Sequence, residues 1–130
     1  MLTVPINLGS TAQGLAQCAG MLELHHDSLV VKIQSREVVL DVFRSPVRSV
    51  TIPFGTVERI SLRRGLFGCR LELRLKDMNM LAKIPNAKDG IARFKIGRRH
   101  RKDAEEIRSI CQLAIADARL RSLDDLLTGD

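Results

Sequence analysis

The sequence predicts a mainly β fold, in which seven or eight antiparallel strands form a barrel or sandwich and one long C-terminal α-helix seals it. Two observations predict this fold. Apolar and polar residues alternate with a period of two through most of residues 20–96, and near residue 103 the period changes once to the 3.6 residues of a helix. Because no alternation of strand and helix patterns occurs, a parallel sheet is excluded.

The strands are expected in a regular series after a leading segment, residues 1–19, which has no clear period. We expect this segment to be an N-terminal arm, loose or packed at an edge. From Gly20 the alternation predicts a first hairpin whose turn is His26-Asp27-Ser28. Further strands are predicted at residues 38–42, 47–52, 57–63, 70–76, 81–84 and 92–96. The strictest alternation lies in residues 70–76.

The C-terminal helix is predicted at about residues 103–127. Asp103 with Glu106 three residues later is typical of a capping box, and acidic residues suit the positive end of the helix dipole. One helix face is apolar and is expected to plug the strands; it carries Ile107, Ile110, Cys111, Ala114 and Ala118.

A second apolar face lies on the opposite side of the same helix. It consists of Leu113, Ala116, Leu120, Leu123 and Leu127, with alternating spacings of three and four. This spacing is typical of a coiled-coil seam. We therefore expect the chain to form a homo-oligomer through this seam. The alternative is that the tail folds back on its own strands or frays after Ala118.

The positive charge is confined to one part of the chain. The formal net charge is +6, yet residues 63–102 hold thirteen basic side chains against three acidic ones, Glu72, Asp77 and Asp89. Such clustering favours an anionic partner, although a solvated basic face explains it too. The predicted basic contact surface comprises Arg63, Arg64, Arg70, Arg74, Arg93, Lys95, Arg98, Arg99, Arg101 and Lys102.

The segment RRGLFGC, Arg63 to Cys69, joins two predicted strands within this basic region. Its two glycines allow a tight turn with positive φ, which places Leu66 and Phe67 at the tip or folds them onto the strands. Arginines beside an apolar tip suit the surface of an anionic membrane. A plain structural turn is the alternative.

The sequence resembles the bacterial pleckstrin-homology-like domains, a superfamily that includes GRAM and phosphotyrosine-binding modules. The resemblance covers about residues 20–120 and rests on the stretches GMLELHHDSLVV, VTIPFGTVERISLRRGLFGCRLELRL and ARFKIG. It implies two nearly orthogonal sheets that form a barrel and a helix that caps one open end. Residues 20–130 would then be one such domain. The long helix and the leading arm depart from the family pattern.

These features predict a non-catalytic module for binding or assembly, which self-associates and presents a basic surface to a protein or anionic partner. Binding of anionic membrane lipids through the Arg63–Cys69 loop is the first alternative, and nucleic-acid binding is a weaker one. The resemblance also implies that a peptide strand is added beside the helix. We expect a cytoplasmic protein, in part peripheral to the membrane, because three cysteines at unrelated spacings argue against a disulfide framework.

Catalysis is not expected, and neither is a cofactor, a metal ion or a small-molecule substrate. His25 and His26 are neighbours on a strand and point to opposite faces, so they are unsuited to share one metal. Cys69 lies beside a cationic loop that would lower the pKa of its thiol, whereas burial in a strand would make it inert. No spacing of nucleophile and base indicates an active site.

Overall fold

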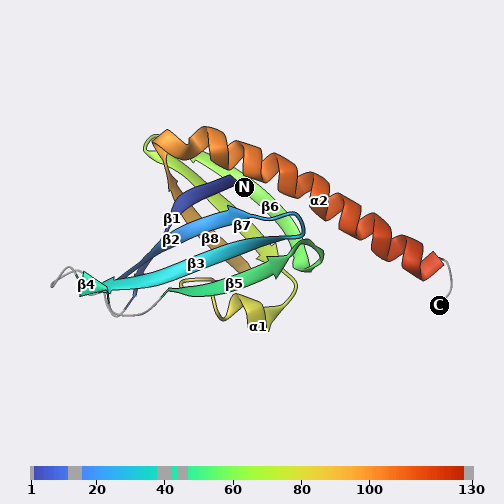
Figure 1. Ribbon diagram of the computed structural model, residues 1–130, viewed down its shortest axis with the longest axis horizontal. Coiled ribbons are helices and arrows are strands. Elements are labelled where there is room, and N and C mark those ends of the chain that lie inside the picture. Colours follow the sequence, from blue (N-terminus) through green and yellow to red (C-terminus); the bar gives the residue numbers. More distant parts are fainter. Residues whose placement is uncertain (1, 12–15, 38–41, 44–46, 128–130) are drawn as a thin grey trace.

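The computed structural model describes residues 2–11, 16–37, 42–43 and 47–127, and these residues are mainly β. The strands are β1 (Leu2–Thr11), β2 (Ala16–Leu24), β3 (Ser28–Glu37), β4 (Val42–Phe43), β5 (Arg48–Pro53), β6 (Val57–Gly65), β7 (Gly68–Leu75) and β8 (Ile91–Gly97). The helices are α1 (Met78–Leu81), α2 (Arg101–Leu127) and the short 3-10 turns η2 (Phe54–Thr56) and η3 (Arg98–His100). The predicted combination of antiparallel strands and one long C-terminal helix is confirmed (Figure 1).

The strands form one antiparallel sheet in the order β4-β3-β2-β1-β8-β7-β6, and β5 also pairs with β3. This sheet is open, because among the described residues β6 pairs only with β7 and β5 only with β3. The closed barrel and the two near-orthogonal sheets expected from the sequence are therefore not seen in the strand pairing. The apolar face of the open sheet is covered in part by α2, which packs mainly against β6 and η2 (Figure 1).

The leading residues form an inner strand, so the expectation of a loose or edge-packed arm was wrong for residues 2–11. β1 lies between β2 and β8, and the alternate side chains Val4, Ile6 and Leu8 are buried. Pro5 hid this pattern, because proline is rare inside sheets. It is tolerated here because β1 and β8 share a single residue pair, Asn7 with Lys95, and run apart beyond it.

Two predicted hairpins, one on each side of the contact between β1 and β8, are confirmed. β2 and β3 meet at the turn around His26, and β6 and β7 meet at the predicted RRGLFGC segment. In the latter pair, Leu71, Leu73 and Leu75 are buried as their alternation predicts. The predicted strand at 38–42 falls on residues outside the described part of the chain, apart from Val42 at the start of β4.

The strand predicted at residues 81–84 was wrong. Residues Met78–Leu81 form the short helix α1, since the carboxylate of Asp77 accepts the backbone N–H groups of Asn79 and Met80 at 2.9 and 3.2 Å. Such a side-chain cap favours a helical turn over a strand. The two apolar residues that suggested a strand, Leu81 and Ile84, are buried on the core from this turn.

The long helix α2 begins at Arg101, directly after η3, so Asp103 lies inside its first turn and is not its N-cap. Its buried residues are Ala104, Ile107, Cys111 and Ile115. Ile110, predicted to be in the core, is 41% exposed instead, and Ile115 takes its place. The C-terminal end of α2 extends past the sheet (Figure 1), and none of the helices in the described residues has the length and apolar character needed to cross a bilayer.

Candidate anion-binding surface

The outward-facing side chains of β6, β7 and β8 form a grid of three cross-strand rows. Strand register aligns Arg63 with Arg70 and Lys95 in the first row, Ser61 with Glu72 and Arg93 in the second, and Arg59 with Arg74 and Ile91 in the third. We call its six basic side chains the basic face: Arg59, Arg63, Arg70, Arg74, Arg93 and Lys95. With Glu72 as the one acid of the grid, the basic face has a net charge of five.

Arg59 belongs to this face although the sequence did not indicate it. A register shift between Val57 and Arg59 leaves Glu58 and Arg59 exposed in succession, and this breaks the alternation of β6. Such a β-bulge turns a side chain to the face opposite to the one that simple alternation assigns. A bulge depends on pairing with β7, and its one trace in the sequence is the pair of successive polar residues, Glu58 and Arg59, between Val57 and Ile60.

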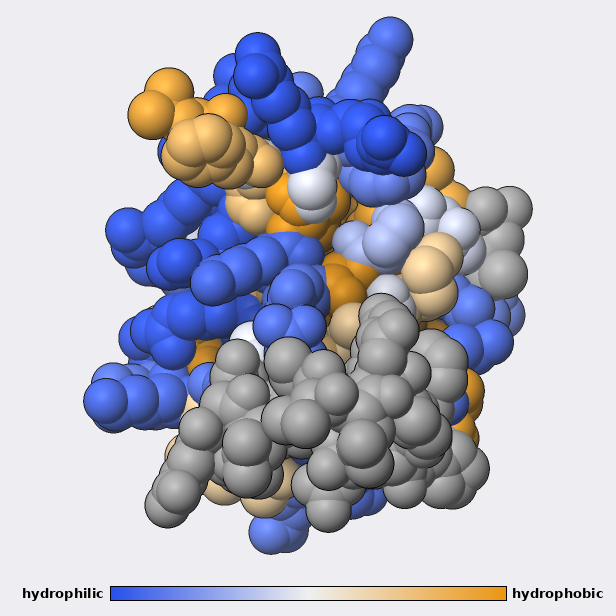
Figure 2. Space-filling model, turned by 90° about the vertical axis from the view of Figure 1, so that its left-hand side faces the viewer, coloured by the Kyte–Doolittle hydropathy of each residue, from blue (hydrophilic) through white to orange (hydrophobic). Residues whose placement is uncertain are grey.

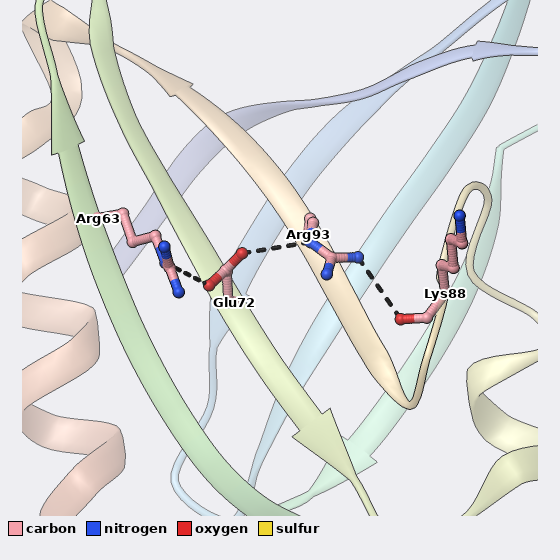
Figure 3. Close-up of polar contacts among 4 residues, drawn as sticks. All are labelled: Arg63, Glu72, Lys88 and Arg93. Atoms are coloured by element: carbon pink, nitrogen blue, oxygen red, sulfur yellow. Dashed lines mark hydrogen bonds and ion pairs between the residues drawn. The ribbon is translucent and has the colours of Figure 1, made fainter.

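Glu72, in the second row of the grid, stands between Arg93 of the same row and Arg63 of the first row (Figure 3). Its Oε1 accepts from Nε of Arg63 at 2.8 Å and its Oε2 from Nε of Arg93 at 3.2 Å. A guanidinium nitrogen of Arg93 also donates to the backbone carbonyl of Lys88 at 3.5 Å. The carboxylate is 11% exposed, so it fixes the directions of both arginines from beneath the surface.

The first row keeps its positive charge. Arg63 reaches diagonally to Glu72, whereas Arg70 and Lys95 have no ion-pair partner among the described residues. Like charges directly opposite one another on neighbouring strands destabilise a sheet. A row of three cations is therefore an arrangement that an anion bound across the strands would stabilise.

The hairpin tip lies at the end of this row. Gly65 pairs with Gly68, and between them Leu66 and Phe67 are 83% and 92% exposed, so the tip does not fold onto the strands. Of the two glycines, Gly68 has the positive φ, +154°. A Cβ at this position would lie 2.4 Å from the carbonyl oxygen of Ile96, so the close approach of β7 to β8 requires glycine here.

The tip is tied to the start of α2 by two arginines of the predicted contact surface. The guanidinium of Arg101 donates to the carbonyl oxygens of Gly65 and Gly68, and Arg64 forms an ion pair with Glu105. These two cations therefore hold the tip in place. Arg98, Arg99 and Lys102 are exposed near the same end of the molecule.

This end, where α2 begins, lies at the left of Figure 1 and faces the viewer in Figure 2. Long hydrophilic side chains stand out from it in Figure 2, and exposed apolar atoms project beside them. Two hollows adjoin Lys95 there. One, of about 500 Å³, runs along the tip and Arg70, and the other, of about 730 Å³, lies where β1 and β8 part.

Cys69 and Cys111 are not activated as nucleophiles, because both thiols are buried. Burial raises the pKa of the Cys69 thiol above its ordinary value, although Arg101 and Arg64 act in the opposite direction. Burial alone raises the pKa of Cys111 to about 12. Within the described residues no three metal-binding side chains cluster, and His25 instead contacts Glu23 at 3.1 Å.

The predicted seam of α2 lies on the exposed side of the helix. Leu120 and Leu123 are 62% and 54% exposed, Leu113 and Leu127 more so, and Ala116 is exposed as well. Leu126, which the sequence analysis did not assign to the seam, is also exposed.

No protein-family model, curated protein sequence or solved structure matches this chain.

Proposed function

We propose that this chain is a non-catalytic binding and assembly module that docks on an anionic partner through its basic face, and that this partner is the surface of an anionic lipid bilayer. One observation carries the proposal: an exposed apolar tip, Leu66 and Phe67, ends a row of three cations that includes Arg70 and Lys95. Peripheral docking of this kind needs no membrane-spanning segment.

The basic face and the apolar tip would contribute to membrane binding through two different interactions. Each Lys or Arg near an anionic leaflet contributes about 1 kcal/mol, which falls off within a Debye length. The apolar tip adds a short-range term, because full burial of a side chain such as Leu or Phe contributes about 1.5–3 kcal/mol. The charges therefore draw the molecule to the surface, and Phe67 then enters the interfacial layer.

The architecture supports a further proposal, that the chain is a pleckstrin-homology-like domain. Five of the described strands, β1 to β5, lie on one side of the Asn7–Lys95 pair, and three, β6 to β8, lie on the other. A division into two parts followed by a C-terminal helix is what that family resemblance implies. The proposal does not require β1 and β8 to pair beyond Asn7 and Lys95.

Nucleic acid fits the surface less well than a bilayer does. Proteins that read single strands stack bases on aromatic side chains. Phe94, which lies next to Lys95 on β8, is fully buried, and the exposed Phe67 is at a hairpin tip rather than on the grid. Nucleic-acid binding is therefore an alternative outcome of the test below.

Vesicle co-sedimentation tests membrane docking. The full chain should bind vesicles that contain phosphatidylglycerol and not vesicles of phosphatidylcholine alone. The double variant Leu66→Ser with Phe67→Ser should lose most of this binding, and so should Arg70→Ser with Lys95→Ser. Lys83→Ser, a charge loss at an exposed site outside the basic face, should not. Equal binding of the tip variant and the wild type would overturn membrane docking, and retained binding of single-stranded DNA by that variant would favour nucleic acid.

Assembly is the second part of the proposed function, and the exposed seam of α2 supports it. Leu120 is 62% exposed and Leu123 is 54% exposed, although Leu123 also borders a hollow against Phe54. We propose that the partner is a second copy of the chain. The apolar residues of the seam are three and four positions apart in alternation, which is the spacing by which two identical helices pack in a coiled coil. Sedimentation tests this part separately, since its residues are not in the basic face.

A further inference from the structure

A hollow of about 730 Å³ lies at the junction of β1 and β8, beside the basic face. It exists because the two strands pair once, at Asn7 and Lys95, and then separate. Pro5 has no N–H to continue the ladder on β1, and Gly97 presents no side chain on β8. Ala19 on β2 is the neighbour of Asn7 in register and is also small, so this part of the sheet stays uncovered.

The lining of this hollow is rich in hydrogen-bond donors and contains no carboxylate. Lys95, Arg98 and Arg99 bring three cations to it, and these have no ion-pair partner within the described part of the chain. Asn7 uses its Oδ1 to accept the backbone N–H of Gly9 at 2.8 Å, which leaves its amide nitrogen as a donor. The rest of the lining consists of the apolar residues Pro5, Ile6 and Ala19 together with Gly97 and His100.

The geometry points to a binding site for a phosphate monoester in this hollow. A phosphate monoester carries a charge of about −1.5 to −2 at neutral pH and has three terminal oxygens that accept hydrogen bonds. Arginine binds such oxygens in a bidentate manner, and lysine binds them as a point charge. Donors from β1, β8 and η3 surround the hollow, and its apolar lining suits the carbon atoms of the ester.

This site is distinct from the surface that we propose for membrane docking. Lys95 borders both, but the docking surface continues from Lys95 toward the tip, whereas the site continues toward Arg98 and Asn7. The phosphate monoester has two sources, a free metabolite or a lipid headgroup, and both offer the same chemistry. Glycerol 3-phosphate represents the free source. Vesicles with phosphatidic acid, compared with phosphatidylglycerol vesicles of equal surface charge, represent the lipid source.

Variants that change size without changing charge give the sharpest test. A Cβ built on Gly97 meets no atom within 4 Å, and the φ of −64° at this residue suits any side chain. Ala19 is exposed on β2 and lines the same hollow. Gly97→Leu and Ala19→Leu should therefore fold and fill the hollow while every cation stays. Thermal unfolding of each variant checks that the fold is kept.

Glycerol 3-phosphate is titrated into the full ¹⁵N-labelled chain, and amide shifts near Lys95 and Arg98 are followed. We expect Arg98→Ser with Arg99→Ser to weaken binding by roughly tenfold or more, which is the loss of one or two charge-assisted hydrogen bonds. Both filling variants should weaken binding by a similar factor because the added side chain occupies the space of the ligand. Lys83→Ser and the tip variant Leu66→Ser with Phe67→Ser should bind as the wild type does.

The possible results separate the site from the docking function. Loss of glycerol 3-phosphate binding in the filling variants supports the site and a free source. A preference for phosphatidic acid over phosphatidylglycerol that the same variants abolish supports the site and a lipid source. If neither probe binds in the hollow, or if both filling variants bind as the wild type does, the site is refuted, whereas vesicle binding through the tip is unaffected by that result.

Discussion

The guanidinium of Arg101 donates to the backbone carbonyl oxygen of Gly65 at 2.8 Å, across 36 residues of sequence. The same side chain reaches Gly68 at 3.3 Å, so the first residue of α2 holds both ends of the exposed turn. A tip fixed in this way loses little conformational freedom when it enters an interface. This fixed geometry would favour the membrane contact that we propose for Leu66 and Phe67.

Replacing Arg101 by lysine should loosen the tip without changing the charge. Lysine carries one point-like ammonium and lacks the planar fork that reaches two carbonyl groups. We expect the free energy of unfolding to fall by about 1 kcal/mol and amide exchange at residues 65–68 to become faster. Arg99→Lys, at an exposed neighbouring site, should change neither quantity. Unchanged exchange in Arg101→Lys would show that the two hydrogen bonds do not order the tip.

Much of this surface followed from the sequence because alternation is a local property. The outward direction of Arg70, Arg74 and Lys95 needed only the knowledge that their neighbours are apolar. The cross-strand rows of the grid could not be predicted in this way, because they depend on the register among three strands and the sequence of one strand does not determine that register. The exposure of the tip also depended on Gly68 and its approach to β8.

The errors have physical causes of the same kind. β1 was missed because Pro5 argues against an inner strand unless the neighbouring strand moves away, as β8 does. The contacts of Arg101 with the tip were also not foreseen, because its hydrogen bonds join residues that lie 36 and 33 positions apart in the sequence. Asp103 was taken as a helix cap because its spacing to Glu106 fits, but η3 continues directly into α2 and the helix needs no cap there.

Glu72→Gln should have opposite effects on stability and on anion binding. The carboxylate contacts Arg63 at 2.8 Å and Arg93 at 3.2 Å, and both arginines are partly in solvent, so its loss should cost about 1 kcal/mol of unfolding free energy. The net charge of the basic face rises by one at the same time. We expect affinity for phosphatidylglycerol vesicles to rise by severalfold, since each positive charge near the surface contributes about 1 kcal/mol.

Glu58→Gln makes the same change of charge at the β-bulge, away from the second row of the grid. Its effect on vesicle affinity should be the smaller of the two, and it should leave stability close to that of the wild type. Urea unfolding and co-sedimentation measure the two quantities. Equal affinities for Glu72→Gln and Glu58→Gln would show that net charge alone, and not the basic face, governs binding.

Stability in acid should depend on Glu23. Hydrogen bonds from Lys32 at 2.9 Å, and then from His25 at 3.1 Å, hold the pKa of this carboxyl below its ordinary value of 4.5. A lowered pKa in the folded state means that the stabilisation is present above pH 4.5 and is lost as the pH falls through the folded value. Thermal unfolding should therefore show a loss of stability below about pH 4.5 that is smaller in Glu23→Gln.

Glu106→Gln provides the comparison for this titration. It removes an exposed carboxylate for which the described residues provide no ion-pair partner. Its stability should follow the same course with pH as that of the wild type. An identical acid dependence in Glu23→Gln and the wild type would mean that the contacts with Lys32 and His25 contribute nothing to stability.

Self-association should depend on Leu120 and Leu123. Full burial of one leucine contributes about 1.5–3 kcal/mol, whereas association itself costs roughly 4–15 kcal/mol. Four leucines from each of two copies would contribute about 12–24 kcal/mol if they were fully buried, which exceeds most of this range. Sedimentation equilibrium should therefore show a mass that rises with concentration. Leu120→Asp with Leu123→Asp should give a monomer at all concentrations.

Leu66→Asp is the control, because it makes the same chemical change at the 83% exposed tip. It should reduce vesicle binding and have the same mass as the wild type at each concentration. A wild-type chain that is monomeric at every concentration would remove the role assigned to the seam.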